Sequence, residues 1–436
     1  MPKITFMGAG STVFARNVLG DCMVTDTIEN LRIALYDIDA ERLKESELML
    51  DNINRTNNGG RARIESFLGV RRRKSALKNA DFVVNAIQVG GWKPSTHIDF
   101  EVPKRFGLRQ TIGDTIGIGG IFRALRTIPV VMDFARDMEE VCPNAWLLNY
   151  TNPMAMLTGA VQRHTNVKTV GLCHSWQICA LLLCAMLELP HDNLRWNVAG
   201  INHQAWLLEI SRNGNDLYPE IRKRAQMKEH INKDTVRFEI MKRFGYYNTE
   251  SSEHTAEYSP YFIKSQYLEL IEEFNVPLDE YPRRCIEQIE EWKDLRKQIV
   301  TTKKPLRHAR GHEYASYIIE AMLTGKPCTI GGNVINGSII ANLPRNACVE
   351  VKCVVDRTGI HPTVVGDLPE QLAALNRTNI NVQLMTIEAA MTRKRDAVYQ
   401  AAFLDPHTGA ELPMDRIVNM CDALFKAHGN MMPRFK

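Results

Sequence analysis

The stretch "KITFMGAGST" at residues 3–12 decides the fold class of this chain. A short apolar run ends at Gly8 and Gly10, and residues with helical spacing follow from Ser11 onward. Gly8 permits a tight turn, and Gly10 lets the backbone approach a pyrophosphate held at the N-terminus of the helix. The third glycine position of the GxGxxG fingerprint is Val13. The stretch therefore predicts a strand, a glycine turn and a helix that together can hold a dinucleotide.

Alternating strands and helices continue through the first third of the chain. Apolar segments of strand length occur at residues 31–39, 62–68, 81–87, 145–153 and 167–173, and segments with helical periodicity separate most of them. Strands joined by helices form a parallel sheet with helices on its faces. We therefore predict an α/β fold that begins with a Rossmann-like, doubly wound parallel sheet.

An acidic residue follows the second predicted strand, in the sequence "YDID". Asp37 lies 27 residues after Gly10, which is longer than the usual spacing of about 20 residues in dinucleotide-binding units. A carboxylate at this place can accept hydrogen bonds from the ribose hydroxyls of NAD, and it repels the 2′-phosphate of NADP. The sequence predicts NAD as the cofactor.

The pattern changes near residue 196. Extended, partly alternating segments occupy residues 194–214, polar helices follow, and residues 328–344 and 347–356 read as further strands. The stretch from Leu368 to Gly429 has helical periodicity and few helix breakers. We expect a NAD-binding Rossmann-like domain at 1–195 and a mixed α+β domain at 196–436 that contributes to the substrate and metal site and to oligomerisation.

The composition is that of an ordinary globular chain. Of its 436 residues, 44% are hydrophobic and 24% are charged, and 54 bases against 50 acids give a net charge of +4. We expect neither a nucleic-acid partner, which needs a basic face, nor a membrane partner, since no apolar run approaches about 20 residues. The ten cysteines lack the spacing of a disulfide framework or of CxxC. We expect reduced thiols and a cytoplasmic location.

Two short motifs suggest a site at the ends of strands. "GLCHS" at residues 171–175 places Cys173 and His174 after one predicted strand, and "INHQA" at 201–205 places Asn202 and His203 within a later extended segment. One thiolate and one imidazole are too few for a structural zinc site, which needs four ligands, but suit a catalytic metal with open positions. The alternative is a buried cysteine and a core histidine with satisfied hydrogen bonds.

Longer motifs resemble those of a known enzyme family. "GAGSTVF", "GDTIGIGGIFRALRTIP", "LNYTNPMA", "GLCHS", "GINHQAW", "TESSEHTAEY" and "YPRRC" occur in this order along essentially the whole chain. Together they resemble glycoside hydrolase family 4, and most of all its bacterial members that hydrolyse melibiose-type α-galactosides. Family 4 departs from the usual hydrolysis by two carboxylates and depends on NAD.

The resemblance implies a particular chemistry. NAD⁺ takes a hydride from C3 of the sugar, a base removes the C2 proton, and the glycosidic oxygen leaves by elimination with help from an acid. Water then adds to C1, and NADH returns the hydride. A divalent ion, usually Mn²⁺, binds the C2 and C3 oxygens. The resemblance also implies a small-molecule α-galactoside as substrate and a homodimer or homotetramer.

Roles for individual residues follow from the same resemblance. Metal ligands of the family match Cys173 and His203, and the acid matches His174. The choice of base stays open between His254 and Tyr258, with Asp114 at the position that tunes it. Substrate contacts are expected from Asn149, Asn152 and Arg284, although Arg284 could instead contact another subunit. Cofactor contacts are expected from Gly8, Gly10, Ser11, Thr12, Asp37 and Asn85.

Other functions remain open at this stage. Within the family, an α-glucosidase, an α-glucuronidase or an α-galacturonidase would share these motifs. A net NAD-dependent dehydrogenase of the lactate or malate type shares the N-terminal fold, but no segment resembles the catalytic histidine loop of those enzymes. A NAD-binding regulator without catalysis is a third class.

Overall fold

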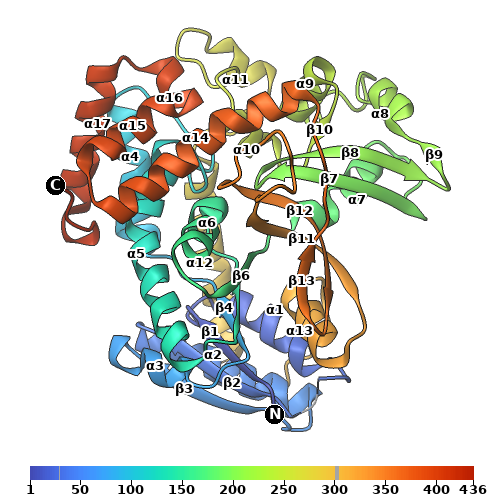
Figure 1. Ribbon diagram of the computed structural model, residues 1–436, viewed down its shortest axis with the longest axis vertical. Helices are drawn as coiled ribbons and strands as arrows, with labels where there is room; N and C mark the ends of the chain where they lie inside the picture. The colour runs from blue at the N-terminus through green and yellow to red at the C-terminus, as the bar shows by residue number, and fades with distance from the viewer. Residues whose placement is uncertain (29, 300–303) are drawn as a thin grey trace.

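One continuous sheet organises the molecule. The computed structural model describes residues 1–28, 30–299 and 304–436 (Figure 1). Within these ranges 13 strands form a single sheet, in the order β10-β8-β7-β12-β11-β6-β5-β4-β1-β2-β3, with β13 on β12 and β9 on β8. The half built from the N-terminal strands is parallel, and the half built from the later strands is antiparallel.

The parallel half confirms the predicted Rossmann-like fold. Its strands run in the order β3-β2-β1-β4-β5-β6, which is the order of dinucleotide-binding sheets. The change of direction between β1 and β4 creates a crevice at the carboxyl ends of these strands, where ligands collect. The strands are β1 (Lys3–Met7), β2 (Arg32–Asp37), β3 (Arg63–Leu68), β4 (Phe82–Asn85), β5 (Trp146–Asn149) and β6 (Lys168–Gly171).

Helices cover both faces of this half (Figure 1). They are α1 (Thr12–Met23), α2 (Ala40–Asn57), α3 (Arg73–Leu77), α5 (Gly117–Val141) and α6 (Met154–His164). Of the other early helices, α4 (His97–Arg105) packs on α5, and α7 (Ser175–Met186) packs on strands of the antiparallel half. The sequence pattern predicted α5 only from Phe122. Its first residues are mostly glycine and carry no apolar periodicity, but Gly120 packs so closely that a Cβ there would lie 2.7 Å from the carbonyl carbon of Thr115. A side chain at this position would collide with the turn that precedes the helix, so glycine stands where the pattern would need an apolar residue.

In the antiparallel half, the order of the strands in the sheet differs from their order in the chain. Strands β11 (Cys328–Ile335) and β12 (Cys348–Asp356) lie between β6 and β7 (Leu194–Ile201). β8 (Gln204–Arg212), β9 (Asn215–Asp216), β10 (Tyr247–Asn248) and β13 (Gly359–Pro362) complete it. The strand predicted at 328–344 ends at Ile335, because the Asn336 amide donates to the carbonyls of Ile340, Leu343 and Pro344 and closes a loop. The domain boundary predicted at 195/196 falls within the first residues of β7 and stays a prediction.

The last segment forms a helical layer against the sheet (Figure 1). α14 (Glu370–Thr392) packs on α5 and α6; α15 (Arg395–Leu404), α16 (Pro406–Glu411) and α17 (Met414–His428) follow it. Buried Asp99 joins Arg126 of α5 and His428 of α17. The remaining helices are α8 (Tyr218–Arg224), α9 (Thr235–Phe244), α10 (Ser252–Glu257), α11 (Glu269–Glu273), α12 (Glu280–Lys297) and α13 (Tyr314–Thr324).

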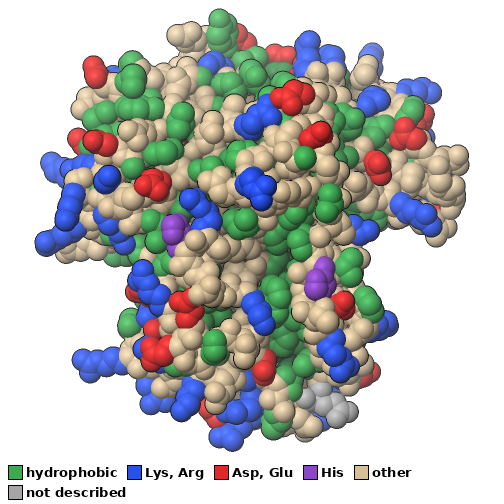
Figure 2. Space-filling model, viewed as in Figure 1, with side chains coloured by type: hydrophobic (Ala, Val, Ile, Leu, Met, Phe, Trp, Pro, Cys, Tyr) green, Lys and Arg blue, Asp and Glu red, His purple; other side chains and the backbone are tan. Residues whose placement is uncertain are grey.

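The surface is mixed in character. On the face shown in Figure 2, lysines and arginines lie among acidic and hydrophobic side chains rather than in one patch. No described helix is both long enough and apolar enough to cross a bilayer.

Candidate active site

The glycine turn after β1 is built by main-chain contacts. Gly8 has a φ of +89°, and a Cβ there would lie 2.8 Å from the carbonyl oxygen of Ala86, so this position requires glycine. The Gly10 N–H donates to Asp37 Oδ2 at 2.6 Å. The other Asp37 oxygen accepts from the N–H groups of Ile38 and Asp39. Asp37 thus ties the end of β2 to the turn, and its contact with ribose stays a prediction.

The other predicted cofactor residues lie at the same edge. The Ser11 N–H donates to the Gly8 carbonyl at 3.0 Å and precedes α1, which begins at Thr12. Asn85 ends β4, is fully buried, and donates to Asn149 Oδ1 at 2.9 Å. All six residues therefore stand at the carboxyl ends of β1, β2 and β4, where the crevice opens.

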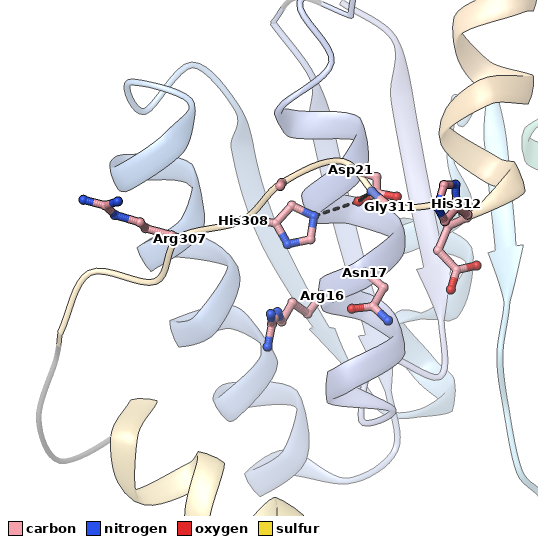
Figure 3. Close-up of a pocket in the computed structure, with 9 residues that line it drawn as sticks. Arg16, Asn17, Asp21, Arg307, His308, Gly311 and His312 are labelled. Atoms are coloured by element: carbon pink, nitrogen blue, oxygen red, sulfur yellow. Dashed lines mark hydrogen bonds and ion pairs between the residues drawn. The ribbon is translucent and has the colours of Figure 1, made fainter.

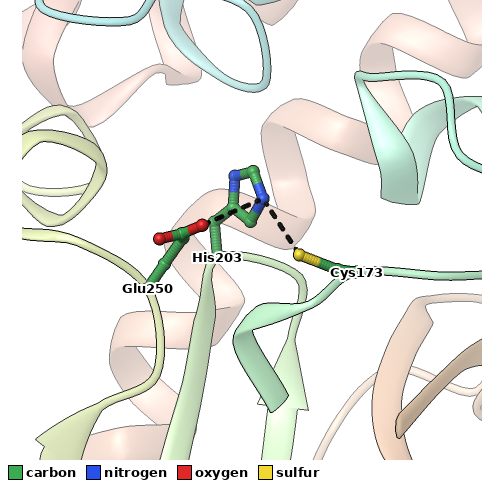
Figure 4. Close-up of side chains that lie close together, drawn as sticks. All are labelled: Cys173, His203 and Glu250. Atoms are coloured by element: carbon green, nitrogen blue, oxygen red, sulfur yellow. Dashed lines mark hydrogen bonds and ion pairs between the residues drawn. The ribbon is translucent and has the colours of Figure 1, made fainter. Parts of the chain in front are cut away.

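A second cluster lies at the ends of β6, β7 and β10 (Figure 4). Cys173 follows β6, His203 stands in the two-residue turn between β7 and β8, and Glu250 follows β10. Cys173 Sγ lies 3.5 Å from His203 Nε2, which lies 4.0 Å from Glu250 Oε1. The donor atoms of all three residues are within 4.8 Å of one another. The arrangement can hold one ion.

The conformation, protonation state and hydrogen bonding of His203 suit a metal ligand. It has a φ of +62°, a left-handed conformation that few residues other than glycine adopt. Burial, followed by the charge of His254, lowers the pKa of His203 to about 4, so its ring is neutral at pH 7. Thr115 donates its hydroxyl hydrogen to Asp114, and its oxygen can accept from His203 Nδ1 at 3.1 Å. This contact leaves the Nε2 lone pair facing Cys173.

The thiol of Cys173 needs a cation to ionise. Burial, with the negative charges of Glu350 and Glu250, raises its pKa well above the usual range. A bound divalent ion reverses this effect and deprotonates the sulfur. Sulfur, imidazole and carboxylate together suit first-row divalent ions, so the residues present fit the metal that the family motifs imply.

Asp114 connects this cluster to His254. Asp114 accepts from Asn152 at 3.0 Å, and its other oxygen lies 3.8 Å from His254 Nε2. Burial opposes the ionisation of Asp114, but His254 and Arg123 outweigh it and hold its pKa well below the usual range. The rings of His254 and His203 are 4.2 Å apart.

His174 lies beside the cluster with a partner of its own. Its Nε2 lies 2.8 Å from Glu313 Oε2, and its ring stacks on Tyr314. The hydrogen bond to Glu313 raises the pKa of His174 despite burial. Its side chain is 43% exposed. A partly exposed imidazole held by a carboxylate can donate a proton to a leaving group.

Comparison with known proteins decides the family. Residues 3–189 match the model of family 4 glycosyl hydrolases, and residues 198–408 match the model of their C-terminal domain. The chain belongs to glycosyl hydrolase family 4. These two segments meet around the boundary expected at 195/196.

Named relatives of this family 4 hydrolase are similar along the full length. It is 62% identical to an α-galactosidase of Bacillus subtilis (strain 168), with 100% of both chains covered. It is 32% identical to an α-galactosidase of Rhizobium meliloti (strain 1021), with 99% of this chain and 89% of the relative covered. The fold matches a 6-phospho-alpha-glucosidase from gut microorganisms, solved in complex with NAD and Mn²⁺, with a TM-score of 0.82, 20% identity and all of both chains covered.

Three residues expected in the site of the family 4 hydrolase have other partners. Asn149 is 1% exposed, and its amide donates to the Thr151 carbonyl and to Thr158 Oγ1. Tyr258 is buried, and its hydroxyl donates to the Asn202 carbonyl behind the His203 turn. Arg284 pairs with Glu280 of its own helix and with Glu253. Their direct contacts with substrate stay predictions.

Sequence reasoning missed three acids. Glu250 and Glu313 are described above. Glu350 on β12 is fully buried and accepts from Asn202 and Asn333 behind the His203 turn. Glu250 lies within the motif "TESSEHTAEY", but only the pairing of β10 with β8 brings it beside His203, and Glu313 and Glu350 reach the site from distant positions in the chain.

A hollow adjoins the His174 side of the site. It has a volume of about 240 Å³ and lies between α1 and the segment before α13 (Figure 3). Asp21 on α1 accepts from His308 Nε2 at 2.7 Å and from the Gly311 N–H at 3.0 Å, which fixes the segment. Glu313, the partner of His174, lines this hollow, but Cys173 and His203 do not. The hollow is therefore separate from the ion cluster.

Proposed function

We propose that this chain is an α-galactosidase that hydrolyses melibiose-type α-galactosides with NAD and a divalent ion, Mn²⁺ in the first instance. The observation that carries the proposal is the 62% identity, over both full lengths, with the Bacillus subtilis α-galactosidase. The cofactor crevice and the Cys173–His203 cluster at one edge of the sheet support it, because the reaction needs dinucleotide and ion side by side.

The bound cofactors supply what side chains lack: a reversible hydride acceptor, and positive charge at the C2 and C3 oxygens of the sugar. The chain itself orients them. The glycine turn and Asp37 position the dinucleotide, and Cys173 with His203 holds the ion. His174 donates a proton to the leaving oxygen from Nδ1, since Glu313 occupies its Nε2.

The contacts favour His254 as the group that accepts the C2 proton. The Tyr258 hydroxyl donates to the Asn202 carbonyl behind the turn. The His254 ring faces His203, and although its Nδ1 lies 3.1 Å from Ser251 Oγ, its Nε2 has only the longer contact of 3.8 Å with Asp114. Burial lowers the pKa of His254, but Asp114 and Glu250 outweigh it and raise the pKa to about 9. His254 can therefore accept a proton only when positive charge beside His203 has lowered this pKa.

Hydrolysis in D₂O tests the elimination route. Because the C2 proton exchanges with solvent, the galactose product should carry deuterium at C2, measured by NMR. Galactose incubated with the enzyme in D₂O is the control for exchange after hydrolysis. A product without the C2 label would reject the route. Stoichiometric accumulation of NADH would indicate net dehydrogenation instead, and a panel of p-nitrophenyl sugars with NAD⁺, Mn²⁺ and a thiol reductant would identify the sugar.

We also propose a homodimer or homotetramer in a reducing, cytoplasmic setting. All ten cysteines are free thiols, and oxidation of Cys173 would remove a ligand. Exposed apolar side chains such as Met414 in the helical layer support association. Light scattering coupled to size-exclusion chromatography measures the oligomeric state.

A further inference from the structure

We propose that Glu250 is a third protein ligand of the divalent ion, beyond the Cys173 and His203 pair of the family motifs. The inference rests on the proposed function only for the presence of an ion. The observation behind the proposal is geometric. The three donor atoms lie within 4.8 Å of one another, and Glu250 approaches His203 on the side away from Cys173 (Figure 4).

The distances suit a shared ion. Two donors with bonds of about 2.0–2.3 Å to one ion lie roughly 3–4.5 Å apart, depending on the angle between them. The separations of 3.5 Å from Cys173 to His203 and 4.0 Å from His203 to Glu250 fall in this range. The third separation, between Cys173 and Glu250, is at most 4.8 Å, so a displacement of about half an ångström, the size of ordinary thermal motion, brings it into the same range.

Local structure presents Glu250 to the site. β10 pairs with β8 through Asn248 and Trp206, so the segment after β10 runs beside the turn that carries His203. The Ser251 N–H donates to Glu250 Oε2, which leaves Oε1 facing His203. The side chain of Glu250 is 25% exposed, whereas that of His203 is 4% exposed. Glu250 therefore lies at the open side of the cluster, where it can move without disturbing the core.

Charge gives the reason for a third ligand. A divalent ion with one thiolate and one neutral imidazole leaves a net positive charge in a buried place, which costs free energy. The carboxylate of Glu250 cancels that charge. An oxygen donor also makes the site harder, which favours Mn²⁺ over softer ions such as Ni²⁺. Three protein donors would still leave such an ion open to ligands from the substrate or solvent.

Binding of Mn²⁺ alone tests the assignment. Mn²⁺ is titrated into the full-length protein, the variant Glu250→Gln and the control Glu253→Gln, and the concentration of free Mn²⁺ is measured by electron paramagnetic resonance. Glu253 is three residues further on and pairs with Arg284 away from the cluster. We expect Glu250→Gln to weaken Mn²⁺ binding about 10–100-fold, to weaken Ni²⁺ binding less, and Glu253→Gln to leave Mn²⁺ binding unchanged.

Further readouts separate the possible outcomes. In the Co²⁺-loaded protein, the absorption bands of the ion should change in Glu250→Gln if the carboxylate is a ligand. Equal Mn²⁺ affinity and an unchanged Co²⁺ spectrum would overturn the assignment, even if activity fell. NAD⁺ binding and thermal melting verify that the variant is folded, and Glu250→Asp, which keeps the carboxylate, should retain part of the affinity. The assay contains no sugar, so a failure of the proposed α-galactosidase activity would not affect it.

Discussion

The glycine turn and the ion cluster occupy the same edge of one sheet but are built differently. Main-chain groups make most of the turn: the left-handed backbone of Gly8 lies against the carbonyl of Ala86, and the N–H of Gly10 donates to Asp37, the main side-chain contribution. Side chains make the cluster, where Cys173, His203 and Glu250 come from three separate strand ends. The turn depends on the absence of side chains, and the cluster depends on their identity.

This difference predicts separable failures. A substitution at the turn should weaken binding of the dinucleotide and leave binding of the ion unchanged. A substitution at the cluster should weaken binding of the ion and leave binding of the dinucleotide unchanged. The expected effects decrease from the ion ligands to the turn and then to a buried carboxyl group in the helical layer, outside both regions.

The largest effect is expected for Cys173→Ser. A hydroxyl at this position is a poor anionic ligand, so we expect turnover of a p-nitrophenyl α-galactoside to fall at least about a hundredfold. NAD⁺ affinity, measured by calorimetry, should stay within about twofold, since the turn is made by other residues. Normal turnover in the presence of added Mn²⁺ would contradict the ligand role of Cys173.

The substitution Gly8→Ala should have a smaller effect, and it should weaken binding of NAD⁺ rather than binding of the ion. The added methyl group would lie 2.8 Å from the Ala86 carbonyl oxygen at a φ of +89°. We expect a loss of about 1–3 kcal/mol in the free energy of unfolding and NAD⁺ binding weaker by about tenfold or more, with Mn²⁺ affinity retained.

The matched control for this substitution is Gly60→Ala. Gly60 has a φ of +74°, but no atom lies within 4 Å of the place that the added methyl group would take. It should show the cost of the backbone conformation alone, with NAD⁺ affinity unchanged. If both variants bound NAD⁺ equally well, the close approach at Gly8 would not matter for the cofactor.

The smallest effect is expected at Asp405, which caps α16 beside the start of α5. Burial raises its pKa to about 6, against the opposing hydrogen bond from Thr408. The folded protein therefore holds this proton more tightly than the unfolded chain, and its stability decreases as the pH rises from about 4 through about 6.

The variant Asp405→Asn should remove this pH dependence while keeping the cap. The free energy of unfolding of the variant, relative to the wild type, should rise on the order of 1–2 kcal/mol between pH 4 and pH 7. Urea unfolding at several pH values measures it. Parallel pH profiles for the two proteins would show that Asp405 ionises normally.

The same contrast explains what the sequence predicted. A glycine turn is a local signal, since Gly8, Gly10 and the alternating apolar runs lie within a few residues, and so the fold class was predicted correctly. Cys173 and His203 stand at strand ends that the pattern also located, and the structure brings them together. Glu250 stands in a motif that the sequence showed, but its place beside His203 depends on the pairing of β10, and the contact of Glu313 with His174 depends on the packing of α13, so neither position could be predicted. The start of α5 was missed because its glycines, which lie close to the preceding turn, carry no apolar periodicity.

The place of β11 and β12 bears on how the enzyme is made. These strands lie between β6 and β7, and Gly200 on β7 pairs with Glu350 on β12. During synthesis the hairpin that carries His203 has no neighbour on that side until residues beyond 350 have emerged. The nucleotide-binding half can fold early from nearby contacts, whereas the sulfur and the imidazole reach each other only late. We therefore expect the nascent chain to complete its ion site only after its nucleotide-binding half.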